Sequence, residues 1–179
     1  MQAVGKGKEK MTDTPKHQME YETIQALFRH NLWANTFLFE QCAQLNDDQF
    51  NSKVIGTYGS IRDTLEHIAN AERSYFHRLS TGQPYRRPQD APTPTMGELQ
   101  ESIRSSGEGL INIAPSFQAY DSVEVDWDGT PRKVPCAVIL TQVINHATEH
   151  RAQIMVMMTQ LGIQPQDLDG WTFFEENDK

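Results

Sequence analysis

The feature that most restricts the fold is a long apolar segment without proline near the C-terminal end, residues 138–161. It contains two histidines, His146 and His150, which are four residues apart. Four residues make just over one turn of an α-helix, so the two rings would lie about 40° apart on one helix face. Apolar residues and Gln153 share this face at the spacing of a core-facing stripe. The segment therefore predicts a long helix with two imidazoles that point into a core.

Two inward imidazoles need partners, because a buried polar group without a partner is costly. A shared metal ion is one solution, and hydrogen bonding within the core is another. A third candidate ligand, His67, falls on the edge of another predicted helix. Three histidines with an open coordination position are the usual catalytic zinc arrangement, and imidazole also suits nickel, iron or copper. The residues alone leave a metal site and a metal-free bundle both open.

Several other metal schemes are excluded by the residues that flank the histidines. A zincin needs glutamate directly after the first histidine, where this chain has Ala147. A ferritin-like site needs glutamate three residues before each histidine, and the residues there are Val143 and Ala147. A hemerythrin-like second metal would want a carboxylate at position 71, which is alanine. We therefore expect a single metal ion.

Three polar residues near the histidines are candidates for a supporting or substrate-binding role. Gln153 lies on the histidine stripe, so its amide could hydrogen-bond a ring nitrogen or a ligand. Arg151 points off the stripe. We expect it to form either an ion pair between helices or a contact with a substrate anion. Asn70 shares the helix edge of His67. No residue is assigned a catalytic role from the sequence.

The remaining periodicity predicts three more long helices, a hairpin and a short C-terminal helix. Ser60 and Thr95 are helix N-caps, each followed three residues later by a carboxylate. Four prolines between residues 84 and 94 predict an irregular crossover, so the helix that follows need not run antiparallel to the one before. We expect that following helix, which is polar and contains two glycines, to be the most exposed of the four. The predicted helices span 19–45, 61–79, 96–113, 138–161 and 165–176, and the predicted hairpin spans 123–134.

Composition limits the partners and the cellular compartment. The net charge is −8 and the pI is about 5.2, which argues against nucleic-acid binding. The two cysteines form no disulfide framework and suit a reducing cytosol. There is neither a run of the ~20 apolar residues that span a bilayer nor a secretory leader. We expect a disordered tail over residues 1–18, a single domain over 19–179, no membrane partner and a cytoplasmic location.

These motifs resemble those of the DinB-like (damage-inducible) family. The resemblance covers residues 21–174 and rests on three motifs in order. They are Trp33-Ala34-Asn35, then His67-Ile68-Ala69-Asn70-Ala71-Glu72, then Asn145-His146-x-x-x-His150-Arg151-x-Gln153 followed by Leu161-Gly162 and Asp167-Leu168-Asp169. One departure is Glu149, where many members carry a further histidine.

The resemblance implies an all-α four-helix bundle with up-down-down-up order, often dimeric. It also implies one divalent metal ion, with zinc, nickel and iron as candidates, held by His67, His146 and His150. Relatives include thiol S-transferases that use bacillithiol, mycothiol or glutathione, so a small thiol and an electrophile are the expected partners. A non-catalytic metal-binding protein of the stress response is the main alternative, and a metal-free bundle is the third hypothesis.

Overall fold

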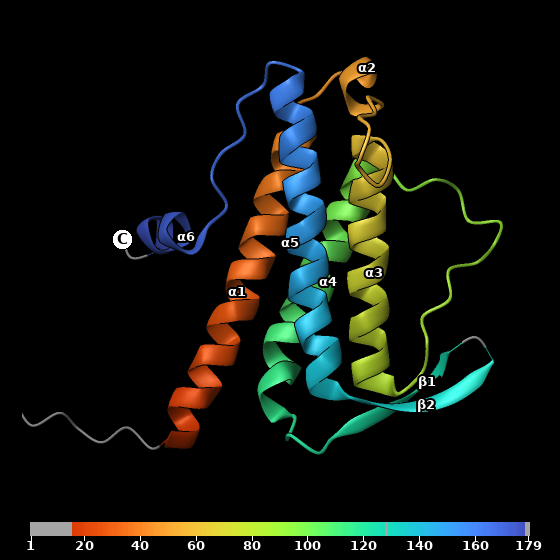
Figure 1. Ribbon diagram of the computed structural model, residues 1–179, viewed down its shortest axis with the longest axis vertical. Helices are drawn as coiled ribbons and strands as arrows, with labels where there is room; N and C mark the ends of the chain where they lie inside the picture. Colours follow the sequence, from red (N-terminus) through yellow and green to blue (C-terminus); the bar gives the residue numbers. More distant parts are fainter. Residues whose placement is uncertain (1–15, 128, 178–179) are drawn as a thin grey trace, which may run out of the picture.

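The computed structural model describes residues 16–127 and 129–177, and it is a bundle of four long helices (Figure 1). The four are α1 (Lys16–Cys42), α3 (Ile61–Thr81), α4 (Met96–Ile113) and α5 (Cys136–Gln160). In Figure 1, α1 and α5 run upwards and α3 and α4 run downwards, which confirms the predicted up-down-down-up order. Helix α1 begins three residues before the predicted start, so residues 16–18 of the expected tail are helical. The rest of that tail lies outside the described residues.

The four helices pack in a ring in which α1 and α3 each contact both α4 and α5. The crossover that joins α3 to α4, residues 82–95, runs back along the length of the bundle (Figure 1). As the prolines predicted, α4 is therefore parallel to α3 rather than antiparallel. Helices α3 and α5 are neighbours in this ring, so His67 on one and the histidine pair on the other can face each other.

Capping side chains fix where the helices begin. Ser60 and Thr95 each accept a hydrogen bond from the backbone N–H three residues later, and both capping boxes are complete, as predicted. A short helix between α1 and α3, α2 (Asp47–Phe50), was not predicted. Its capping box pairs Asn46 with Gln49. That pattern is present in the sequence, directly after the predicted end of the first helix at residue 45.

Helix α4, which we expect to be the most exposed of the four long helices, nevertheless packs closely against α1. Its inner face carries buried residues along its whole length, and Gly107 lies among them. A Cβ atom at Gly107 would come within 2.6 Å of Leu32 Cδ1, so the missing side chain allows α1 to pack directly against the α4 backbone. The polar composition of this helix concealed a position where close approach requires glycine.

Smaller elements lie at one end of the bundle and along its side (Figure 1). The predicted hairpin is confirmed as β1 (Ser122–Trp127) paired antiparallel with β2 (Thr130–Pro135), and η1 (Ala114–Ser116) leads into it. The last helix, α6 (Gly170–Asn177), lies beside α1, and Trp33 Nε1 donates to Glu176 Oε2 at 3.0 Å. None of the helices in the described part of the chain is long and apolar enough to cross a membrane.

The core consists of two apolar clusters separated by a polar layer. One cluster includes Leu38, Ile68 and Ile154, and the other includes Leu110 and Val143. Between these positions on the four helices lie buried polar side chains: Asn31, Asn35, Glu72, Ser106, His150 and Arg151. The histidines are at the edge of this polar layer.

Candidate metal centre

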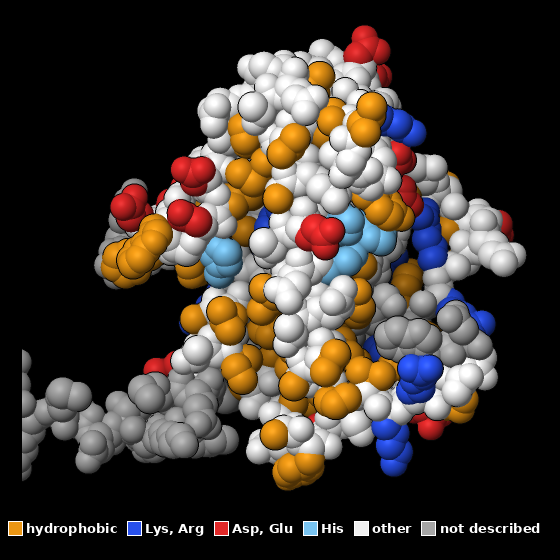
Figure 2. Space-filling view, in the orientation of Figure 1, with side chains coloured by type: hydrophobic (Ala, Val, Ile, Leu, Met, Phe, Trp, Pro, Cys, Tyr) orange, Lys and Arg blue, Asp and Glu red, His pale blue; other side chains and the backbone are white. Residues whose placement is uncertain are grey.

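Three histidines from two helices meet at the α3/α5 interface. His67 comes from α3, and His146 and His150 come from α5. Each can offer a ring nitrogen such that all three nitrogens lie within 4.8 Å of one another, and His67 Nε2 is 2.9 Å from His146 Nε2. Histidine side chains are visible at the surface midway along the bundle, over α3 and α5 (Figure 2). The centre is therefore only partly covered, and a small molecule can approach it.

Gln153 orients the ring of His150. The side-chain oxygen of Gln153 accepts from the backbone N–H of Tyr58 at 3.2 Å and lies 2.9 Å from His150 Nδ1. An amide oxygen only accepts, so Nδ1 must carry the proton. His150 Nε2 is then free of hydrogen and available to a metal ion, the usual arrangement for a metal-binding histidine. Gln153 thus makes the ring contact that its position on the stripe suggested.

The surroundings favour the neutral form of His67 and His146. Burial, together with the neighbouring His150 and His67, lowers the pKa of His146 to about 4. Burial and His150 also lower the pKa of His67 below its ordinary value. Metal ions bind the neutral ring, so no proton has to be displaced from these two residues near neutral pH. The lowered pKa values of His67 and His146 therefore favour the binding of a metal cation.

The spacing of the rings also fits one ion. Two nitrogens that each lie 2.0–2.1 Å from a tetrahedral metal ion are about 3.3 Å apart. The 2.9 Å separation of His67 and His146 and the 4.8 Å limit for the set bracket that value, so small ring movements would place all three nitrogens around one ion. Three neutral nitrogen ligands are a borderline-soft set that suits zinc, nickel or iron.

A buried hydrogen-bond network joins all four helices behind the histidines. Glu72 Oε2 accepts from the side-chain amides of Asn31 and Asn35 at 3.0 and 2.9 Å, and its Oε1 accepts from Ser106 Oγ at 2.8 Å. Arg151 Nη1 donates to the oxygens of the same two amides at 2.9 and 2.6 Å. Two asparagines thus join the carboxyl group of Glu72 to the guanidinium of Arg151. Each of the four long helices contributes at least one residue to this network.

Burial dominates the electrostatics of this network. It raises the pKa of Glu72 to about 7, against the opposing effects of Ser106, the asparagines and Arg151. Burial also lowers the pKa of Arg151 to about 10, against the attraction of Glu72. Arg151 is 4% exposed, so its guanidinium serves the helix interface here. A role for Arg151 or Asn70 toward a substrate stays a prediction.

Asn70 lies away from the histidine rings. Its side-chain oxygen accepts from Arg73 Nη2 at 3.0 Å, and it lines a cavity beneath the crossover. By contrast, Tyr58 from the connection after α2 was not singled out, yet its ring stacks on His67 with 3.9 Å between centroids. No periodicity marks a loop residue, so nothing in the sequence placed Tyr58 there. Glu72 had a signal, because a carboxylate on an apolar helix stripe requires buried partners.

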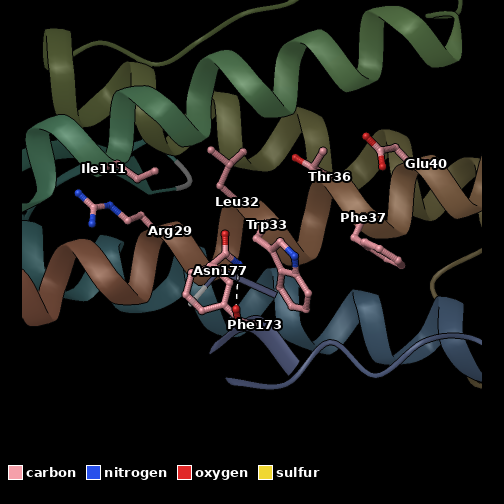
Figure 3. Close-up of a pocket in the computed structure, with 9 residues that line it drawn as sticks. All are labelled: Arg29, Leu32, Trp33, Thr36, Phe37, Glu40, Ile111, Phe173 and Asn177. Carbon is pink, nitrogen blue, oxygen red and sulfur yellow. Dashed lines mark hydrogen bonds between the residues drawn. The ribbon is translucent and has the colours of Figure 1, made fainter. Parts of the chain in front are cut away.

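A cavity between α1 and α6 offers a useful contrast (Figure 3). It measures about 350 Å³ and is lined mainly by apolar side chains. Its charged residues, Arg29 and Glu40, lie at opposite ends and do not converge on a common point (Figure 3). The histidine centre, in contrast, brings ligand atoms from two helices to one place, so it is the better candidate for chemistry.

Comparisons with known proteins agree with the motifs and the fold. The model of the DinB family matches residues 15–178. The chain is also similar to "Protein DinB" of Bacillus subtilis (strain 168), with 20% identity over 166 residues that cover 86% of this chain and 95% of that protein.

Proposed function

The chain belongs to the DinB family, and on that premise we propose that it is a metal-dependent thiol S-transferase or a related metalloenzyme that acts on a small electrophile. One divalent ion would be held by His67, His146 and His150. The observation that carries the proposal is this trio of imidazoles at a partly open surface, with burial lowering the pKa of His67 and His146. Three protein ligands and an open position are the arrangement of catalytic zinc sites rather than of closed structural ones.

The residues around the centre have separable tasks. The three histidines supply the ligands, and Gln153 holds His150 in the tautomer that leaves Nε2 free. Tyr58 covers one face of His67, which restricts how that ring can turn. A bound divalent ion would lower the pKa of a thiol that reaches the open position, so that the thiol loses its proton to solvent near neutral pH. The thiolate sulfur would then form a bond to the electrophilic carbon, and the leaving group would depart with the electron pair of the bond that breaks.

Metal binding is tested first, on tag-free protein incubated with Zn²⁺ or Ni²⁺. We expect about one equivalent of bound metal, and large losses in His67→Ala, His146→Ala and His150→Ala. The control is Gln160→Ala, at an exposed position of the same helix, and this variant should keep its metal. Full affinity in His67→Ala would remove the three-ligand site and with it the proposal.

Thiol binding separates an enzyme from a metal-binding protein without turnover. In the Co²⁺-substituted protein, a thiolate that enters the open position gives a new charge-transfer band and changes the visible spectrum. We expect such a change with at least one of bacillithiol, mycothiol and glutathione, followed by turnover with a panel of electrophiles. A spectrum that no thiol alters would favour the alternative, a non-catalytic stress-response protein in which the ion only ties α3 to α5.

Two further expectations stay predictions. A homodimer is expected from the family resemblance, and light scattering of the purified full chain measures its mass directly. A cytoplasmic location is expected from the composition. Both cysteines, Cys42 and Cys136, are buried free thiols, which suits a reducing compartment.

A further inference from the structure

A second cavity, of about 420 Å³, lies between α3, α5 and the hairpin. Its aliphatic lining consists of Val125, Val134, Val138 and Ile139. This volume falls within the range of roughly 300–1,000 Å³ that is typical of small-molecule sites. Val138 is 55% exposed, so an apolar surface inside the cavity remains open to solvent. Such a surface gains free energy when an apolar group covers it.

The cavity lies along the same α3/α5 interface as the histidines. On α5, Gln142 and Ile139 precede His146 by four and seven residues and line the cavity. On α3, Ser74 follows His67 by seven residues and also lines it. These spacings keep each residue on the same helix face as its histidine, about 6 to 10 Å along the axis.

Tyr75 forms the boundary between the cavity and the metal centre. Its ring lies 6.0 Å from the ring of His146, centroid to centroid, and it also lines the cavity. In Figure 2, hydrophobic side chains gather on the surface below the histidines, toward the hairpin end of the bundle. The polar centre and the apolar cavity thus lie next to each other, with Tyr75 in contact with both.

The hairpin supplies the outer wall of the cavity. Val125 of β1 and Val134 of β2 are partly buried, while the alternate residues Glu124 and Lys133 are exposed. Arg78 of α3 donates to the backbone oxygen of Glu124 at 3.3 Å, which ties the hairpin to the bundle. The apolar face of the hairpin is therefore turned toward the cavity and held there.

We infer that this cavity binds the apolar part of the electrophile whose reactive atom meets the histidine centre, an inference that rests on the proposed function. The substrate class is a small elongated molecule with an aliphatic or aromatic end about 6 to 10 Å from its electrophilic atom. A compact or fully polar electrophile would leave the four aliphatic side chains uncovered.

Linear alkanethiols test the inference in the Co²⁺-loaded full-length protein, because each joins a sulfur for the metal to an apolar chain for the cavity. We expect little gain from ethanethiol to butanethiol, whose chains end short of the cavity, and a rise in affinity of about threefold to fourfold for each methylene added from butanethiol to hexanethiol. Val138→Trp fills the cavity and abolishes this gain. Val156→Trp places the same side chain at a valine of α5 that is 49% exposed and outside the cavity, and it keeps the gain.

The outcomes separate the inference from the proposed function. The inference would be overturned if thiol affinity did not depend on chain length. It would also be overturned if Val138→Trp and Val156→Trp lost the chain-length gain in affinity equally. If no thiol perturbs the cobalt spectrum, the proposed function fails, and metal-free protein titrated with hexanol then decides about the cavity. Shifts of the methyl NMR signals of Val125, Val134 and Val138 support the cavity as an apolar site, and unchanged signals overturn it.

Discussion

At the residue scale, one amide controls the orientation of a metal-binding ring. Gln153→Ala removes the acceptor of His150 Nδ1, so the ring can rotate and adopt either tautomer. We expect metal affinity to fall roughly 10- to 100-fold, as is usual when such a hydrogen bond is lost. Isothermal titration with Zn²⁺ measures the change. Gln160→Ala, on the exposed face of the same helix, is the matched control, and equal affinities in the two variants would contradict the role of Gln153.

A buried acid predicts a pH dependence of stability. The pKa of Glu72 is raised from 4.5 to about 7 in the folded protein, so folding takes up a proton between these values. The contribution to stability is therefore full below about pH 4.5 and is lost as the pH rises through about 7. Glu72→Gln cannot ionise, and its amide can donate to Ser106 where the carboxylate accepted.

The measurement compares metal-free wild type with Glu72→Gln in urea at pH 5 and pH 8. Wild type should lose on the order of 1–3 kcal/mol more of its free energy of unfolding than the variant over this interval. Every other titratable group is the same in both proteins, so the difference isolates Glu72. Parallel losses in the two proteins would show that the carboxyl does not change its protonation state on folding.

Single residues also show where prediction from sequence stops. The histidines were found because two of them share a helix stripe at a four-residue spacing, and His67 because it lies on the edge of another helix. The hydrogen bonds of Glu72 were not found, since its partners come from three other helices whose relative rotation is a tertiary property. For Asn31 and Asn35, only the packed bundle shows that Glu72 is the partner of both side-chain amides.

At the element scale, helices were predicted best where a cap defines an end. Ser60 and Thr95 start their helices as expected, because capping is a local interaction within four residues. The close packing of α4 at Gly107 was not predicted, because it depends on how closely α1 approaches. Local sequence reports on the helix itself, and only the packed bundle reveals which face is covered.

The close approach of α1 and α4 gives a test with an internal control. In Gly107→Ala, the new methyl group would meet Leu32 Cδ1 at 2.6 Å, with the Cβ and Cγ of Leu32 at 3.2 Å. We expect a loss of about 1–3 kcal/mol in the free energy of unfolding, although alanine is the better helix former. Gly97→Ala in the same helix meets nothing within 4 Å and should be neutral or stabilising. Denaturant unfolding of both variants checks this, and a stabilised Gly107→Ala would refute the close packing.

At the scale of the whole molecule, an ion shared by α3 and α5 couples metal binding to unfolding. Ligands that bind only the folded state at about 100 times Kd add about 2.7 kcal/mol of stability. For a chain of this size, that corresponds to a rise in Tm of roughly 5–10 °C. Thermal unfolding with and without Zn²⁺ measures the shift, and His67→Ala should show little of it. An equal shift in that variant would place the ion elsewhere.

The crossover between α3 and α4 divides the ligand set as well as the chain. A cut anywhere within residues 82–95 would give one piece with α1, α3 and His67 and another with α4, α5, His146 and His150. Neither piece alone could surround an ion with three imidazoles. Measured affinity for the ion would therefore show whether the two pieces had reassembled with α3 and α5 in the correct register.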